Sequence, residues 1–156
     1  MGYDYYGSFS KTTGPVTPFT NSPQFGKGLQ SSVQYYLDKG VRRDKLIVGL
    51  PYYGAEWYTS TDVIGSQVDR FRSHPPYSAI RKYYLDSMGL SAKFDTASQS
   101  SYLILEDPTH FYRQLFLKVI APFPLSSNGS RTRALPVPGC GLWGMMKDIL
   151  NYGMYL

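Results

Sequence analysis

The run DKLIVGLPYYG at residues 44–54 constrains the fold more than any other part of this sequence. Within it, Leu46–Leu50 form a continuous apolar stretch that Pro51 closes. A short unbroken apolar run of this kind is typical of a strand buried on both faces, as in parallel sheets. A parallel strand must be reached through a long crossover, most often a helix, so the residues before it should supply one.

The preceding residues do contain a predicted helix. In SSVQYYLDKG, Ser31 or Ser32 can cap the N-terminus, and Gly40 suits the position after the last turn. Residues 8–28 are rich in Ser, Thr, Pro and Gly and predict a loop, and MGYDYYGS at residues 1–8 predicts a short strand ending in a turn. Strand, loop, helix and buried strand together predict a βαβ unit and an α/β fold.

The rest of the chain is less regular. Residues 55–76 are polar, a helix is predicted from Tyr77 to a stop at Gly89, and AKFDTASQSSYLILED predicts a hairpin or two short strands. PTHFYRQLFLKVI predicts a further strand, and LWGMMKDILNYGMYL at the end fits a short helix or a strand. From Ala121 to Gly141 no periodicity of either kind remains, which predicts a loop.

Charge and cysteine content narrow the function classes. Residues 1–117 hold 12 Lys and Arg against 10 Asp and Glu, so most of the net charge of +5 lies in the last quarter of the chain. No basic run with interleaved aromatic residues is present, and we expect no nucleic-acid partner. One cysteine, Cys140, excludes an internal disulfide, and the two histidines, His74 and His110, lie far apart, so we expect no metal site. We also expect no cofactor.

Two observations concern location. No apolar run is long enough to span a bilayer, and we expect no membrane partner. No signal peptide precedes Tyr3.

Three stretches resemble glycoside hydrolase family 18, the chitinase-like (β/α)₈ TIM barrels. MGYDYYGS, followed by GPVTPF, resembles the sixth barrel strand, whose pattern is Met-x-Tyr-Asp/Asn. SSVQYYLDKGVRRDKLIVGLPYYGAEW resembles the sixth helix and seventh strand, with the pattern KLxLGxPxYGxxW, and KFDTASQSSYLI resembles the segment that follows. The resemblance implies the C-terminal part of a TIM barrel with an α+β insertion after the seventh strand. Residues 1–117 would be a partial catalytic domain.

The resemblance also implies a chemistry. The family hydrolyses β-1,4-linked N-acetylglucosamine polymers with retention: the acetamide of the substrate attacks the anomeric carbon while a glutamic acid protonates the leaving oxygen. Met1 and Tyr3 match the sixth-strand Met and Tyr, whose hydroxyl contacts the acetamide carbonyl. Asp4 matches the neighbouring sugar-contacting acid, and Tyr53 matches the seventh-strand Tyr. Tyr3 and Tyr53 could instead be ordinary core residues, and Asp4 an N-cap or turn acid.

One part of the family pattern is absent. The catalytic motif D-x-x-D-x-D-x-E occurs nowhere in the 156 residues, and neither Glu56 nor Glu106 follows such a series. A complete barrel needs roughly 250 residues, and this chain corresponds to about strands six to eight. We therefore expect no catalytic residue in the chain and no activity from it alone. Met1 is then a barrel-interior methionine rather than a natural start.

Residues 118–156 pose a separate problem. In the given frame, GCGLWGMMKD offers Trp143 as the aromatic floor of the sugar site. In a frame shifted by one base, Trp143/Gly144 must encode Gly, Met145/Met146 must encode Asp, and the free positions permit WALGYDEGYPELWDV, the ending typical of the family. We interpret residues 118–156 as the frame-shifted end of the same domain, with the slip near Leu115–Lys118.

Together these patterns predict a fragment of a hydrolase acting on chitin or a related N-acetylglucosamine polymer. Its expected partners are a chitin oligosaccharide and the N-terminal part of the barrel, and the parent protein is expected outside the cytoplasm. A rival hypothesis is a non-catalytic sugar-binding module, in which Tyr3, Tyr53 and Trp57 stack on glycans. A third is a basic interaction protein, against which the balanced charge of residues 1–117 argues.

Overall fold

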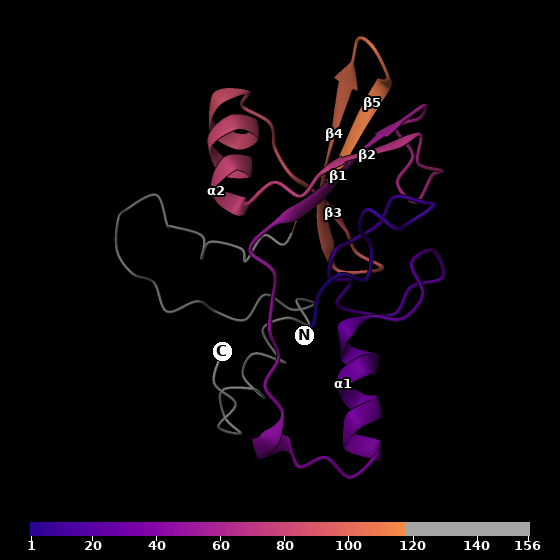
Figure 1. Cartoon of the computed structure of the whole chain (residues 1–156), viewed down its shortest axis with the longest axis vertical. Helices are drawn as coiled ribbons and strands as arrows, with labels where there is room; N and C mark the ends of the chain where they lie inside the picture. The colour runs from indigo at the N-terminus through magenta and orange to yellow at the C-terminus, as the bar shows by residue number, and fades with distance from the viewer. Residues whose placement is uncertain (118–156) are drawn as a thin grey trace.

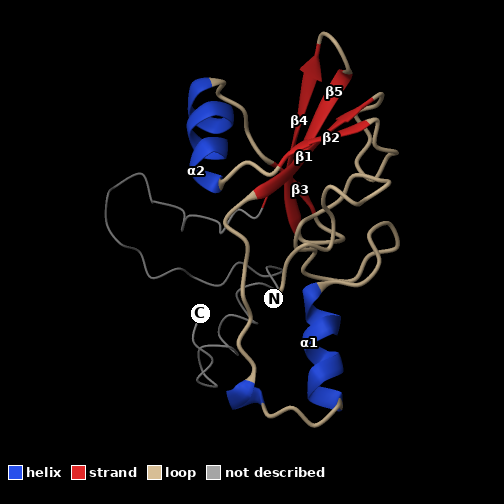
Figure 2. Ribbon diagram, in the orientation of Figure 1, coloured by secondary structure: helices blue, strands red, loops and turns tan. Residues whose placement is uncertain are grey.

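The computed structural model describes residues 1–117. Figure 1 shows a twisted sheet with one helix beside it, a second helix (α1, Leu29–Asp38) below the sheet, and the N-terminus between them. A long extended segment, which follows the short 3-10 helix η1 (Arg43–Lys45), returns the chain from the level of the end of α1 to the sheet. The described part therefore contains both helix and sheet, coloured separately in Figure 2.

The sheet has five antiparallel strands in the order β2-β1-β5-β4-β3. Their bounds are β1 Gly54–Thr59, β2 Arg70–Ser73, β3 Lys93–Asp95, β4 Ser100–Asp107 and β5 Phe111–Leu117. β4 and β5 pair along their length, and β1 pairs with β5 over its whole length. The predicted hairpin of residues 92–107 and the predicted strand after Pro108 are both present.

Both predicted helices form, with different ends. α1 begins after Gly28 rather than after Ser31 or Ser32, and Gly40 follows it in the left-handed region (φ 86°). The second helix begins as a short α-helical turn, α2 (Tyr77–Ala79), and continues as a π-helix, η2 (Ile80–Ser87). Gly89, also left-handed (φ 64°), ends it as the sequence predicted.

The two strands predicted in the βαβ unit are absent as regular elements. Residues 1–4 and 46–50 are not paired as strands, and one hydrogen bond, from Gly2 N to Gly49 O at 2.9 Å, joins the two segments. Leu46–Leu50 is not buried on both faces either: Ile47 is 72% exposed. A strand of a parallel sheet is covered by other elements on both faces, whereas none of residues 46–50 is buried in this structure. The prediction of a buried strand here was wrong for this structure.

Two hydrophobic clusters cover opposite faces of the sheet, because successive residues of a strand point to opposite sides. Leu115 and Leu117 of β5 join the cluster under η2, together with Ile80 and Leu103. Phe116, between them, joins the other cluster. That second cluster consists of Val16, Phe25, Ala55, Trp57 and Phe116.

The loop between residues 12 and 19 is almost entirely buried and ties the N-terminal segment to the sheet. Thr13 Oγ1 donates to Gln114 Oε1 at 2.7 Å, and the Gln114 amide in turn donates to two carbonyl oxygens of the β1–β2 connection. A buried polar side chain with all these partners fixes the loop in one position. Residues 1–5 are thereby held against the start of β1, where the candidate site lies.

Within residues 1–117, no helix has both the length and the apolar character to cross a bilayer.

Candidate functional site

The candidate site lies where the N-terminal segment meets the residues just before β1. Tyr5 N donates to Val16 O at 3.1 Å, and Gly2 N donates to Gly49 O, so residues 2–5 are held on both sides. Asp4, between these bonds, has φ 60°, a left-handed conformation that Asp tolerates better than most side chains.

Tyr53 and Asp4 are in direct contact although 49 residues separate them. The Tyr53 hydroxyl donates a hydrogen bond to Asp4 Oδ1. The Tyr3 ring packs edge-on against the Tyr53 ring, with centroids 6.2 Å apart and an interplanar angle of 77°. The Tyr3 hydroxyl donates to the sulfur of Met1. The structure thus brings together Met1, Tyr3, Asp4 and Tyr53, which we call the tyrosine-aspartate cluster.

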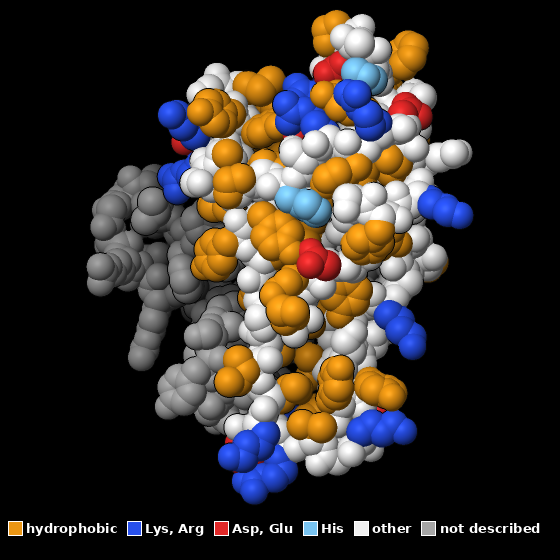
Figure 3. All heavy atoms as spheres, in the orientation of Figure 1, with side chains coloured by type: hydrophobic (Ala, Val, Ile, Leu, Met, Phe, Trp, Pro, Cys, Tyr) orange, Lys and Arg blue, Asp and Glu red, His pale blue; other side chains and the backbone are white. Residues whose placement is uncertain are grey.

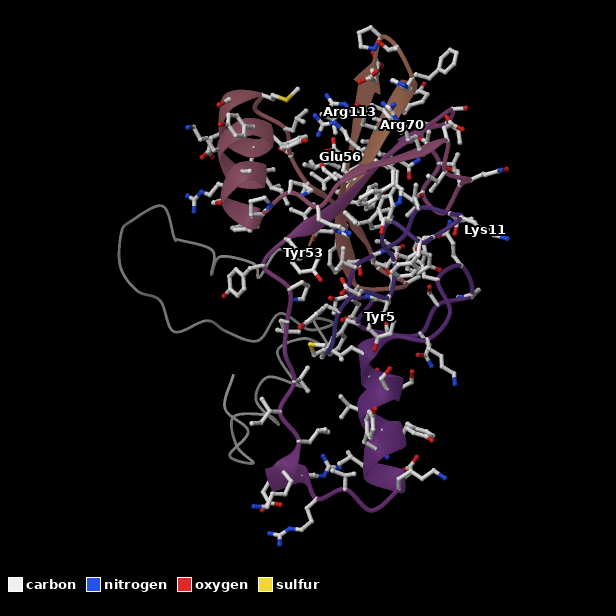
Figure 4. All side chains as sticks on the ribbon, in the orientation of Figure 1. Tyr5, Lys11, Tyr53, Glu56, Arg70 and Arg113 are labelled. Atoms are coloured by element: carbon white, nitrogen blue, oxygen red, sulfur yellow. The ribbon has the colours of Figure 1, made fainter. Side chains whose placement is uncertain are left out.

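The cluster is open to solvent. Asp4 and Met1 are exposed, and Tyr3 and Tyr53 are partly buried. In Figure 3 an acidic side chain and a histidine lie side by side among hydrophobic side chains near the middle of the face, in the region where Figure 4 labels Tyr53. The arrangement offers a carboxylate acceptor, phenol groups and ring edges to a ligand that approaches from this face.

Sequence reasoning missed one neighbour of this cluster, His74. Its ring packs edge-on against Tyr53 at 5.6 Å between centroids, and its Nδ1 lies 3.2 Å from Gly54 O. Gly54 N donates to Pro75 O and thereby places the residues before α2 alongside the start of β1. The stretch 55–76 is irregular in sequence, so no periodic signal indicated that His74 returns to Tyr53.

The environment of Tyr53 raises the pKa of its hydroxyl above the ordinary tyrosine value. Burial is the largest cause, and the hydrogen bond to Asp4 and the charge of Asp4 add to it. The neutral phenol is thus the form that the folded chain favours. A raised pKa contributes stability that is present below the ordinary tyrosine pKa of about 10 and is lost as the pH rises through the folded-state pKa.

We therefore predict that Asp4→Asn lowers the pH at which Tyr53 ionises, because it removes the negative charge beside the hydroxyl. The measurement is a pH titration of the 156-residue chain carrying ¹³C-tyrosine, with Tyr53→Phe used to assign the resonance. Asp44→Asn is the matched control, since Asp44 is exposed and pairs with Arg42 away from this cluster. An unchanged Tyr53 titration in Asp4→Asn would contradict the contact.

Trp57 does not belong to the cluster. Its indole is 0% exposed, lies among Phe71 and Phe116, and Nε1 lies 3.3 Å from Gly7 O. A fully buried ring cannot present its face to a sugar, so the predicted stacking role of Trp57 is wrong in this structure. Its side chain points to the face of the sheet that Val16 and Phe25 cover. Trp143 and the predicted frame-shifted tail lie outside the described residues.

Glu56 is buried but has no feature of a proton donor to a substrate. Its carboxylate, 0% exposed, lies 2.5 Å from Arg72 Nη1 and 3.2 Å from Arg113 Nη1, and accepts the Tyr84 hydroxyl at 2.9 Å. Figure 4 labels Glu56 and Arg113 close together beside the sheet. Burial raises the pKa of Tyr84, as does the Glu56 charge. Burial lowers the pKa of Arg72, but the hydrogen bond to Glu56, the Glu56 charge and the smaller effects of Tyr58 and Tyr84 together raise that pKa above the ordinary arginine value. These groups form a closed ionic cluster inside the sheet domain.

The other described glutamate, Glu106, is exposed on β4. Across residues 1–117, no three His, Cys, Asp or Glu side chains converge in a group that could hold a metal ion. Among the described residues, the candidate site therefore consists of the tyrosine-aspartate cluster and its neighbour His74.

Comparison with known proteins points to one family. The model of "Glycosyl hydrolases family 18" matches residues 1–115. Chitinase 1 of Aphanocladium album is 30% identical over 107 residues, which are 65% of this chain and 25% of that protein. The probable endochitinase of Caenorhabditis elegans is 29% identical over 100 residues, 61% of this chain and 15% of that protein. The chain spans a quarter or less of the length of these relatives.

Solved structures show the same fold. The chitinase ChiW from a Paenibacillus species superposes with a TM-score of 0.66 and 24% identity over 76% of this chain and 11% of its own. The GH18 chitinase from Cycas revoluta, solved in complex with (GlcNAc)3, gives a TM-score of 0.60 and 21% identity over 74% of this chain and 33% of its own. These likenesses assign the partial α/β fold of the described residues to the fold of these chitinases.

Proposed function

Because the chain belongs to glycosyl hydrolase family 18, we propose that residues 1–117 form one wall of a substrate site for chitin or a related N-acetylglucosamine polymer. The wall is the tyrosine-aspartate cluster. On binding, the Tyr3 O–H turns from the Met1 sulfur to the acetamide carbonyl of the sugar, and Asp4 accepts the acetamide N–H. Tyr53 holds Asp4 in place and presents its ring edge to the same sugar.

One observation carries this proposal: the hydrogen bond between Tyr53 and Asp4, with Tyr3 packed against Tyr53. Three residues that the sequence pattern assigned to one sugar site come from segments about 50 residues apart and meet at one exposed place. An acetamide has one donor and one acceptor, and an exposed carboxylate and phenol supply the complementary pair. The carboxylate oxygen that Tyr53 does not occupy is available for the ligand.

In our proposal, this chain does not contain the general acid of the reaction. The motif D-x-x-D-x-D-x-E is absent from the 156 residues, and the buried Glu56 is neutralised by two arginines. Orientation and electrostatic stabilisation of a sugar survive without an acid, whereas protonation of the leaving oxygen does not. The chain alone is therefore expected to bind an N-acetylglucosamine oligomer without cleaving it.

The test is the affinity of the 156-residue chain for (GlcNAc)3, measured by calorimetry. Tyr53→Phe removes a hydrogen bond to a charged group and should weaken binding about tenfold, a change of roughly 1.4 kcal/mol. Tyr52→Phe is the matched control, because Tyr52 is the adjacent tyrosine and is 69% exposed; its effect should stay within about twofold. Equal affinities for the two variants would contradict the proposed wall.

A non-catalytic sugar-binding module is the second candidate. The exposed tyrosine-aspartate cluster favours it, because a carboxylate and phenol groups can bind a sugar without a general acid. The two candidates differ when the chain is joined to a barrel segment that carries D-x-x-D-x-D-x-E. Hydrolysis of chitin by the joined protein supports the enzyme part, and binding without hydrolysis supports the module.

A further inference from the structure

A cleft lies away from the tyrosine-aspartate cluster, between α1 and the loop that precedes it. It has a volume of about 630 Å³ and is lined by residues from 20–38, among them Asn21, Lys27, Gln30, Gln34, Tyr35 and Asp38. It shares no lining residue with the tyrosine-aspartate cluster. Figure 4 labels Tyr53 next to the sheet, above α1. We propose that this cleft is a separate binding site for a neutral oligosaccharide.

The cleft belongs to the polar face of α1. Gln30, Gln34 and Asp38 follow one another at intervals of four and so share one face of the helix, and all three are exposed. Leu29, Val33 and Leu37, at the same spacing, form another face whose side chains are buried or partly buried. The wall of the cleft is thus the solvent face of an amphipathic helix.

The lining chemistry favours an uncharged, polyhydroxylated ligand. Among the lining residues, one ammonium group (Lys27) and one carboxylate (Asp38) offset each other, and Lys39 beside the Tyr35 ring adds a single positive charge, so the cleft holds no cluster of like charges to select an ion. Amides from Asn21, Gln30 and Gln34 provide both donors and acceptors, as hydroxyl groups require. A volume in the range of known small-molecule sites fits one or two sugar rings.

The Tyr35 ring provides the apolar part of the site. It is 59% exposed, and Lys39 Nζ lies 5.7 Å from the ring centroid. An exposed aromatic ring beside polar side chains can pack against the C–H face of a sugar while the polar groups bind its hydroxyls. Tyr36 packs edge-on against Tyr35 at 5.7 Å between centroids and supports its orientation.

The polar walls are already held in place. Asn21 Oδ1 accepts the Gly28 N–H at 2.8 Å, and Thr20 Oγ1 donates to Ala97 O at 2.7 Å, so the loop is fixed at both the helix and the sheet domain. Gln34 Nε2 donates to Asp38 Oδ1 at 2.7 Å. A pre-arranged wall loses less conformational freedom when a ligand binds.

The test is affinity electrophoresis of the 156-residue chain in gels containing glycol chitin or hydroxyethyl cellulose, both neutral polymers. Tyr35→Ala should weaken the retardation in hydroxyethyl cellulose about tenfold, since the stacking surface is lost and this polymer has no acetamide for the tyrosine-aspartate cluster to bind. Tyr83→Ala is the matched control: Tyr83 is 55% exposed and has Lys82 Nζ 5.3 Å from its ring centroid, but lies on η2. Gln34→Ala should also weaken retardation while leaving the Tyr35 ring in place.

Three results would overturn the proposal. One is equal retardation of the Tyr35→Ala and Tyr83→Ala variants, and another is unchanged retardation of Gln34→Ala. The third is loss of wild-type retardation in 0.5 M NaCl, which would show that charge holds the polymer.

The binding site at α1 rests on the proposed function only in the choice of chitin as a test polymer. Tyr53→Phe weakens (GlcNAc)3 binding at the wall but not the Tyr35-dependent retardation, so failures of the two proposals are distinguishable.

Discussion

Glu56→Gln is expected to destabilise the chain by about 3 kcal/mol, a large share of a typical domain's stability. The substitution keeps the size of the side chain and the acceptor for the Tyr84 hydroxyl, but removes the charge that two arginines share. Arg113 is 18% exposed and cannot regain full hydration, but Asp107 Oδ2 stays 3.1 Å from its Nε. Arg72, at 38% exposed, can do so in part, which places the cost at the lower end of the range for a broken buried pair.

The measurement is urea unfolding of the 156-residue chain followed by far-ultraviolet circular dichroism. Glu106→Gln is the matched control, because Glu106 is the other described glutamate and is exposed on β4. Its effect should stay within about 0.5 kcal/mol. If the two variants unfold at the same urea concentration, the Glu56 cluster does not stabilise the sheet as we describe.

Trp57→Ala is expected to cost about 3–5 kcal/mol and to leave the chain largely unfolded. The indole fills the centre of the cluster formed with Val16, Phe25 and Phe116 and is 0% exposed. Removing it loses the transfer free energy of a large side chain and leaves a cavity that the surrounding rings cannot fill. Trp57→Phe keeps most of that volume and should cost less than half as much.

Measurements of stability and of sugar binding distinguish the two roles considered for Trp57, which are a core residue and a platform for sugar stacking. If Trp57 is a core residue, the folded Trp57→Phe variant should bind (GlcNAc)3 as tightly as the original chain. If Trp57 is a sugar platform, the same variant should have a normal unfolding midpoint and weakened binding. Tyr52→Ala, which truncates an exposed aromatic ring, controls for the loss of aromatic surface and should leave the midpoint unchanged.

The sequence predicted local elements well where the pattern depends only on residues within the same segment. The helix ending before Gly40, the helix stop at Gly89 and the hairpin of residues 93–107 all depend on residues near one another in the chain. The segment Leu46–Leu50 failed for the opposite reason. Its apolar run describes an environment, burial between neighbouring strands, that the described residues do not provide.

The candidate site likewise contains residues that the sequence predicted and residues that it did not predict. Tyr3, Asp4 and Tyr53 were assigned together through a family pattern, and the structure places them in contact. His74 was missed because its place beside Tyr53 arises from the pairing of residues 53–54 with 75–76, which has no local signature. Trp57 was misassigned because a strand residue can face either side of a sheet, and only the packing of Val16 and Phe25 on its side shows that the ring is buried.

The most direct measurement of the central claim is a titration of the ¹³C-tyrosine-labelled chain with (GlcNAc)3, with product analysis of the same sample. Tyr3→Phe and Tyr53→Phe assign the two resonances among the 15 tyrosines of the chain. We predict saturable shifts of the Tyr3 and Tyr53 resonances and an intact oligomer at the end. Unmoved resonances at both tyrosines, or release of shorter sugars by this chain, would contradict the account.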